Sequence, residues 1–240
     1  MKKGHLNQIL LLTDGCSNRG EDPQAMAAFA KEQGITVNVI GIMDEHEMDQ
    51  EAMKEVEGIA LAGGGVHQFV YTSQLSQTVQ MVTKKAMTQT IQGVVNSELK
   101  QILGKHTEMD ELPPDKRGEV MEVVDELGET VHLVDTSASM NPKLPTVKEA
   151  LIDLSISLNS RIGENEFAML IFPGKKQEVE LVLDWTPKFE SLSSIFSKLS
   201  AGGITPTGPA IREAIQHFNK IGSRRRMLED DEKRFDEFGG

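Results

Sequence analysis

Short apolar segments alternate with helical patterns along the first third of the chain, and this alternation constrains the fold most strongly. The apolar segments predict buried strands at Ile9 to Thr13, Ile35 to Ile42 and Val66 to Tyr71. Helices are predicted between them at 23–33 and 50–61, the first beginning where Asp22 caps a helix that opens with Pro23. Strands that alternate with helices form parallel crossovers, so we expect a sheet covered on both faces.

A second alternation of the same kind follows near the end of the chain. It predicts strands at 131–134, 166–172 and 179–183, and helices at 147–160, 189–199 and 210–221. Together the two alternations predict an α/β fold with a doubly wound, mostly parallel six-stranded sheet. Between them, residues 89–129 are polar and favour helix, so we interpret them as a helical connector. Residues 222–240 carry dense charges of both signs and are predicted to be a solvated tail.

Composition excludes several classes of function. The formal net charge of -12 disfavours non-specific binding to nucleic acid, whose phosphates this surface would repel. Each Leu-, Ile- and Val-rich stretch is short and interrupted, whereas a membrane span needs roughly 20 apolar residues. The single cysteine rules out an internal disulfide and suits a reducing compartment, so we expect a cytoplasmic protein. The six histidines have no metal-ligand spacing, and we assign no site to them.

Hydroxyl and carboxyl side chains gather just beyond predicted strands. The segment VHLVDTSAS places Asp135, Ser137 and Ser139 after one strand, LLLTDG places Asp14 after another, and ITPTG offers Thr205 before a helix. Open α/β sheets bind ligands at the carboxyl ends of their strands. Oxygen ligands of this number and type suit a hard cation such as Mg²⁺. The first segment alone fits a helix-capping turn better than a metal site, and the coincidence of three segments is what favours the metal site.

These three segments resemble the parts of the metal-ion-dependent adhesion site (MIDAS) of von Willebrand factor type A (VWA) domains: Asp-x-Ser-x-Ser, a Thr in Gly-Gly-x-Thr-Pro-Thr-Gly, and a strand ending Thr-Asp-Gly. The whole chain is also similar to the YabS-like VWA proteins of spore-forming bacteria. The resemblance implies a Rossmann-like VWA fold and a site of Asp135, Ser137, Ser139, Thr205 and Asp14. It also implies a divalent cation there, Mg²⁺ or else Mn²⁺ or Ca²⁺, that binds an exposed Asp or Glu of a protein partner.

The order of the segments departs from the family pattern, because Thr-Asp-Gly comes first in this chain. We therefore expect a circularly permuted single domain over 1–240. In it, residues 5–88 would correspond to the second half of the usual fold and residues 130–221 to the first half, joined by the connector 89–129. The proposed site would lie between the halves, so neither half should bind metal alone.

Three functions remain open from the sequence. The first is a non-enzymatic, metal-dependent protein-interaction module. The alternative is an Mg²⁺-dependent hydrolase or phosphotransferase that uses Asp135, although such enzymes commonly need a second carboxylate two residues later and position 137 is Ser. The third is architectural, since exchange of halves between two chains would give a domain-swapped homodimer.

Overall fold

A six-stranded sheet forms the centre of the molecule, with strand order β3-β2-β1-β4-β5-β6. The computed structural model describes residues 6–43, 49–75, 77, 79–81, 127–159, 164–187 and 203–221. The first part of the chain forms β1 (Leu6–Thr13), α1 (Pro23–Glu32), β2 (Ile35–Met43), α2 (Gln50–Ala62), β3 (Gly64–Tyr71) and the 3-10 turn η1 (Thr72–Gln74). The second part forms β4 (Leu127–Asp135), the 3-10 turn η3 (Ala138–Met140), α5 (Leu144–Asn159), β5 (Glu164–Phe172) and β6 (Glu180–Thr186). A last helix spans residues 207–221.

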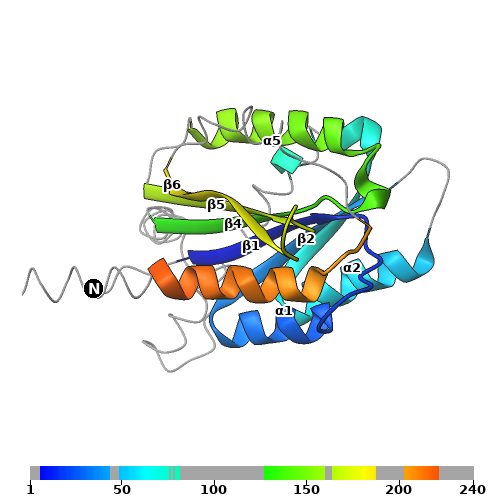
Figure 1. Cartoon of the computed structure of the whole chain (residues 1–240). Helices are drawn as coiled ribbons and strands as arrows, with labels where there is room; N and C mark the ends of the chain where they lie inside the picture. The colour runs from blue at the N-terminus through cyan, green and yellow to red at the C-terminus, as the bar shows by residue number, and fades with distance from the viewer. Residues whose placement is uncertain are drawn as a thin grey trace, which may run out of the picture.

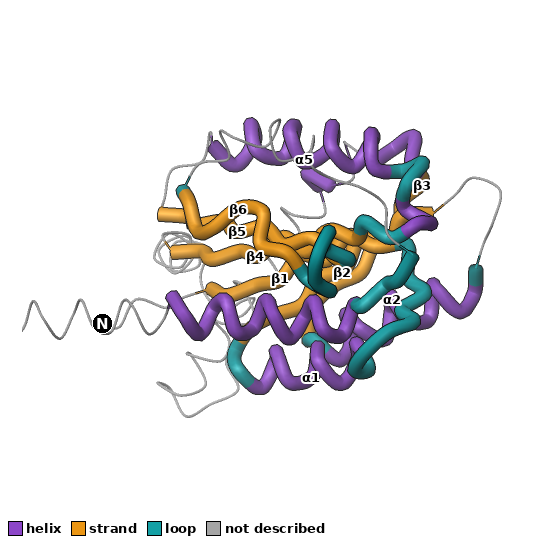
Figure 2. Tube along the Cα trace, viewed as in Figure 1, coloured by secondary structure: helices purple, strands orange, loops and turns teal. Residues whose placement is uncertain are grey.

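Helices cover both faces of the sheet (Figure 1). One face packs against α5, through Val147, Ala150, Leu151 and Leu154. The other face packs against α1, α2 and the helix 207–221, whose Ala210, Ile211, Ala214 and Ile215 join the core there. Figure 2 shows the resulting three layers, helix, sheet and helix. This is the doubly wound α/β architecture that the sequence predicts.

The strands β1 and β4 lie next to each other at the centre of the sheet, although more than a hundred residues separate them along the chain. They pair in parallel over registers from Leu6 with Gly128 to Leu12 with Val134. Their carboxyl ends therefore open on the same edge of the sheet, and the loops after Thr13 and Asp135 meet there. Such an adjacency is what the permuted arrangement requires, while the permutation itself stays a prediction.

Several element boundaries differ from the sequence prediction. The strand β4 begins at Leu127 rather than Val131, so it includes residues that the sequence assigns to the connector. Glu129 and Thr130 are polar, so the sequence shows no apolar run at this part of the strand. Both side chains are nevertheless buried in the sheet. The strand β3 begins at Gly64 rather than Val66, so it includes Gly64 and Gly65. There a Cβ at Gly65 would lie 2.1 Å from the Val37 carbonyl oxygen, so close approach of two strands explains the glycine.

Other boundaries shift at helix starts and at the sheet edge. The final helix begins at residue 207 rather than 210, and α5 begins at Leu144 rather than Val147. The strand β6 runs antiparallel to β5, which makes the sheet mostly parallel, as predicted. The predicted connector up to residue 126, the helix 189–199 and the tail 222–240 lie outside the described residues. In the described part of the chain, no helix is long and apolar enough to cross a bilayer.

Candidate metal centre

The loop after β4 is fixed by hydrogen bonds that start at Asp135. One carboxylate oxygen of Asp135 accepts from the Ser137 amide at 2.8 Å, which folds the chain back in a tight Asx turn. Next to it, Thr136 donates its amide to the Phe172 carbonyl at 2.7 Å and its hydroxyl to the Pro173 carbonyl at 2.9 Å. These bonds attach the loop to the end of β5. The turn therefore holds Asp135 and Ser137 in fixed positions at the edge of the sheet.

The loop after β1 brings a second set of oxygens to the same edge. The Thr13 hydroxyl donates to the other carboxylate oxygen of Asp135 at 2.7 Å and accepts from the Gly15 amide at 3.0 Å. Gly15 has a φ of +86° and lies against α2, where an added Cβ would meet Ala52 at 2.8 Å. Only glycine adopts this conformation readily and also leaves room for the helix. The Thr-Asp-Gly sequence thus turns the chain away directly after presenting Asp14.

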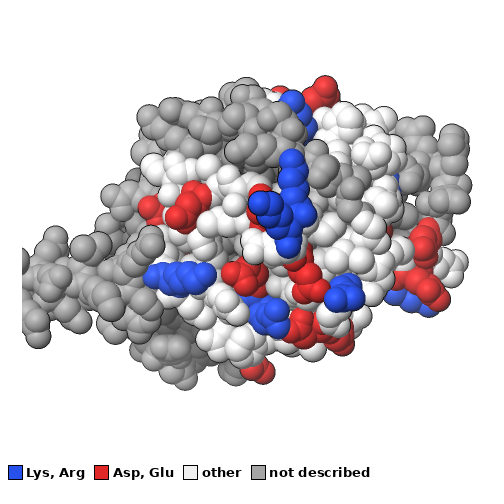
Figure 3. Space-filling model, in the orientation of Figure 1, with Lys and Arg blue, Asp and Glu red and all other residues white. Residues whose placement is uncertain are grey.

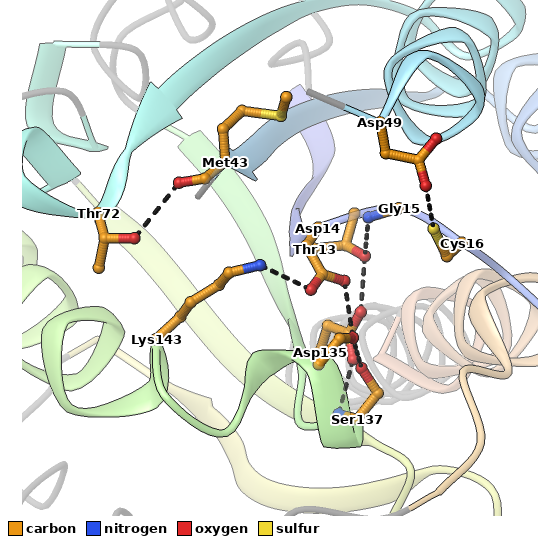
Figure 4. Close-up of polar contacts among 11 residues, drawn as sticks. Thr13, Asp14, Gly15, Cys16, Met43, Asp49, Thr72, Asp135, Ser137 and Lys143 are labelled. Atoms are coloured by element: carbon orange, nitrogen blue, oxygen red, sulfur yellow. Dashed lines mark hydrogen bonds and ion pairs between the residues drawn. The ribbon is translucent and has the colours of Figure 1, made fainter. Parts of the chain in front are cut away.

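The loop after β1, with Asp14, and the loop after β4, with Ser137, come together at this edge (Figure 4). The Ser137 and Ser139 hydroxyl oxygens lie 3.1 Å apart, and Ser139 donates to a carboxylate oxygen of Asp14 at 3.2 Å. Asp14 and Ser139 are thus in contact although they belong to different sequence segments. Four of the five residues that the sequence predicts as ligands, Asp135, Ser137, Ser139 and Asp14, form one connected group of oxygens.

Thr205, the fifth predicted residue, contacts the loop after β1 through its backbone, and its hydrogen bonds go to Ser17 and Asn18 rather than to these four side chains. Its carbonyl accepts from the Asn18 amide at 3.2 Å and from the Ser17 hydroxyl at 3.3 Å, and its amide donates to the Asn18 side chain at 2.9 Å. The glycine at 208 approaches Glu21 so closely that a Cβ would lie 2.0 Å from the Glu21 carbonyl oxygen. The Thr205 segment therefore packs directly on the loop that carries Asp14.

The electrostatics of the cluster centre on Asp135. Its side chain lies in the interior, and burial raises its pKa to about 7, although hydrogen bonds from Thr13 and Ser137 oppose the shift and the negative charge of Asp14 adds to it. A carboxylate with both oxygens hydrogen-bonded and still a raised pKa lacks a compensating positive charge. A divalent cation beside it would supply that charge.

Two residues of the cluster were not predicted from the sequence. Thr13 appears in the sequence motif only as a spacer before Asp14, yet its hydroxyl positions Asp135. The ammonium of Lys143 lies 2.9 Å from the second carboxylate oxygen of Asp14. A basic residue at the start of a helix carries no sequence signal for such a role, because solvated lysines are common there.

Cys16 also lies beside the cluster, but its chemistry is unfavourable for catalysis. Its thiol donates to Asp49 at 3.5 Å. Burial, the hydrogen bond to Asp49 and the surrounding carboxylates raise its pKa to about 11. The thiol is therefore protonated at neutral pH and is a poor nucleophile.

Comparison with known proteins identifies the family. Residues 1–85 match the sequence model of the von Willebrand factor type A domain. Over 244 aligned residues the chain is 82% identical to the uncharacterized protein YabS of Bacillus subtilis strain 168, and the alignment covers 100% of both chains. The crystal structure of an uncharacterized protein from Alicyclobacillus acidocaldarius is 41% identical, with a TM-score of 0.80, and the match covers 92% of this chain and 96% of that one.

A structure of proximal thread matrix protein 1 from the mussel byssus, which has a zinc-occupied MIDAS motif, is a much weaker match. It is 18% identical, with a TM-score of 0.24 and coverage of 83% of this chain and 43% of that one. A likeness at this level supports no inference about the present site. The family match, the high identity over the whole chain and the doubly wound sheet agree with one another. The chain belongs to the family of YabS, and its first 85 residues match the von Willebrand factor type A domain.

Proposed function

We propose that this protein is a non-enzymatic interaction module that binds a divalent cation and, through the cation, an acidic residue of a protein partner. The proposed ligands are Asp135, Ser137, Ser139, Thr205 and Asp14. One observation carries the proposal: Ser139 from the loop after β4 contacts Asp14 from the loop after β1 at 3.2 Å. The two halves of the proposed ligand set therefore meet within a single chain.

The chemistry of these side chains fits a hard cation. All five offer oxygen, and two of them are carboxylates, which is a donor set that Mg²⁺, Mn²⁺ and Ca²⁺ accept. Among the described residues, no group of three or more His, Cys, Asp and Glu is arranged to hold a metal ion, so the proposed centre depends on hydroxyl oxygens beside its two carboxylates. The raised pKa of the buried Asp135 adds a physical reason for a cation at this position.

The ligand set also indicates the chemistry of the partner. Two carboxylates would balance the charge of a divalent ion, and the five oxygen ligands would leave one position of a six-coordinate shell open. When bound, the ion would supply a positive centre that accepts an oxygen ligand from outside the protein. A carboxylate of an exposed Asp or Glu on the partner is the simplest such ligand.

Metal binding is tested by titrating the purified chain with Mn²⁺ and Mg²⁺ in a calorimeter. The Asp135→Ala variant should lose metal affinity, while Asp153→Ala on α5 should bind metal like the unchanged chain. Asp153 is a matched control because it has the same charge and lies on the helix that follows the site. Equal affinity of the unchanged chain and the Asp135→Ala variant would reject the proposed centre.

Partner binding needs a second test. The chain is immobilised and exposed to a native lysate with Mg²⁺, with EDTA, and with Mg²⁺ after the Asp135→Ala change. A specific partner should be retained only in the first condition. Retention that is equal in all three would exclude a cation bridge as the means of binding.

The other functions predicted from the sequence receive no specific support. Asp135 contacts the Thr13 hydroxyl and the Ser137 amide, and neither group is a general base. The hydrolase prediction is tested by phosphoester turnover that Asp135→Asn abolishes. The contact of Asp14 with Ser139 lies within one chain, so a swapped dimer is unnecessary for completing the site. A mass measurement in solution tests the dimer prediction.

A further inference from the structure

Asp14 carries an ion pair that differs from others on the molecule. The Lys143 ammonium lies 2.9 Å from Asp14, and the two side chains are only 5% and 9% exposed. Two pairs at the surface, Arg19 with Glu178 and Lys220 with Glu213, have side chains that are 40% or more exposed. In Figure 3 the described face shows acidic and basic side chains next to each other in solvent. Exposed pairs of that kind contribute little, whereas the Lys143 pair is shielded from water.

The backbone of Lys143 is fixed where it can reach Asp14. Its amide donates to the Met140 carbonyl at 2.8 Å, and its carbonyl accepts from the Val147 amide at 3.0 Å. Lys143 therefore occupies the junction between η3 and α5, directly after the segment that holds Ser137 and Ser139. From there the side chain extends across to the loop after β1, as Figure 4 shows.

Both carboxylate oxygens of Asp14 are engaged in this arrangement. One accepts from Ser139 at 3.2 Å and the other from Lys143 at 2.9 Å. A cation that binds beside Ser139 and Asp14 would come within a few ångströms of the ammonium. At such a separation, and with little water between them, two positive charges repel each other strongly. Asp14 therefore cannot pair fully with the Lys143 ammonium and bind the divalent cation at the same time.

We propose that Lys143 is an internal competitor of the metal: its ammonium neutralises Asp14 in the metal-free protein, and a divalent cation displaces it from Asp14. This inference rests on the proposed function, because it concerns the same site. Displacement lowers the metal affinity, since the ion must break an existing ion pair. It also makes the metal-free domain stable, since Asp14 is never left buried without a counter-charge.

The test compares Mn²⁺ affinity of the full chain with that of Lys143→Met, which removes the charge and keeps most of the side-chain volume. Lys143→Met should bind Mn²⁺ roughly tenfold more tightly or better, because the competing charge is gone. Lys143→Arg, which keeps the charge, and Lys148→Met, which removes a charge further along α5, should both bind like the unchanged chain. The Lys148 control separates competition at Asp14 from a general change in net charge.

Thermal unfolding in EDTA and in Mn²⁺ distinguishes competition with the metal from a purely structural role of Lys143. Lys143→Met should unfold at a lower temperature in EDTA and gain more from Mn²⁺ than the unchanged chain does. If Mn²⁺ affinity of Lys143→Met equals or falls below that of the unchanged chain, the competition is refuted while the metal centre stands. If the unchanged chain binds no Mn²⁺, the proposed function itself fails and this inference falls with it.

If Lys143→Met does not fold, the unchanged chain supplies the test. Lysine-directed acylation followed by peptide mass spectrometry measures how fast Lys143 reacts with and without Mn²⁺. Displacement predicts that Mn²⁺ increases the labelling of Lys143 several-fold and leaves Lys148 unchanged. Labelling of Lys143 that stays constant or slows on Mn²⁺ addition would overturn the proposal.

Discussion

The amino and carboxyl ends of the central strands both carry buried polar side chains, but the two clusters differ in charge. At the amino end, Gln8 donates to the Thr130 hydroxyl at 2.9 Å and accepts from Asn38 at 3.3 Å, and Asn38 accepts from the Val66 amide at 3.0 Å. This amide ladder, Gln8, Asn38 and Thr130, links four neighbouring strands without any charge. At the carboxyl end, the site cluster contains two carboxylates and an ammonium.

The contrast in charge bears on which of the two clusters would take a ligand. Amides and hydroxyls in the amide ladder supply both donors and acceptors, so they satisfy one another inside the protein. Carboxylates only accept, and burial leaves Asp135 with a pKa of about 7 despite its hydrogen bonds. We propose that the amide ladder stabilises the sheet, whereas the site cluster holds a cation. The predictions below test this division.

The largest expected effect is the loss of metal affinity in Asp135→Asn, which keeps the shape of the side chain and removes its charge. We expect Mn²⁺ affinity to fall about 100-fold or more, since changes even to groups behind a metal ligand typically cost 10-fold to 100-fold. Thr130→Val in the amide ladder should leave Mn²⁺ affinity unchanged. Calorimetry of both variants checks the pair, and equal losses would remove the distinction between the clusters.

The second effect is on stability and concerns the amide ladder. Gln8→Leu deprives Asn38 and Thr130 of a partner, and both are almost fully buried. Leaving buried polar groups unpaired costs about 1–3 kcal/mol for each group, so we expect the unfolding free energy to fall by about 2 kcal/mol or more. Urea unfolding in EDTA measures this, and Mn²⁺ affinity should stay the same. A large drop in Mn²⁺ affinity would contradict a purely structural ladder.

The third effect is a dependence on pH that only the site cluster should show. The pKa of Asp135 is raised in the folded chain from its ordinary 3.8 to about 7, so the folded state holds a proton that the unfolded state releases between these values. In EDTA the unfolding free energy should therefore decrease as the pH rises through this window, relative to Asp135→Asn.

Metal binding should respond to pH in the opposite direction, because the ion must displace that proton. Mn²⁺ affinity of the unchanged chain should rise about tenfold from pH 5.5 to 6.5. Calorimetry at the two pH values provides the measurement. A flat profile would show that Asp135 is already ionised or is not a ligand.

The smallest effect concerns Thr207, whose buried hydroxyl has no hydrogen-bond partner among the described residues. Thr207→Val is nearly isosteric and removes an unsatisfied group, so the unfolding free energy should change by less than about 0.5 kcal/mol or increase. Thr205→Val in the same Thr-Pro-Thr segment should weaken Mn²⁺ binding. If Thr207→Val weakens Mn²⁺ binding more than Thr205→Val does, the ligand of this segment is assigned to the wrong threonine.

The fold and most of the site cluster could be predicted because their signals are local. Apolar runs and caps such as Asp22 mark the elements, Asp14 directly follows β1, and Asp135 ends β4. The start of β4 was missed because Glu129 and Thr130 look exposed in sequence but are buried by neighbouring strands. Lys143 was missed because its role depends on β1 lying beside β4, a long-range contact that no local pattern encodes.

Crystals of the chain soaked in Mn²⁺ and measured for anomalous scattering would test the central claim most directly. We predict an anomalous peak within coordination distance of the Ser137 and Ser139 hydroxyls and near the carboxylates of Asp135 and Asp14. Occupancy should disappear in Asp135→Ala crystals. A fully soaked crystal with no peak at this position, or with its strongest peak elsewhere on the molecule, would contradict the account.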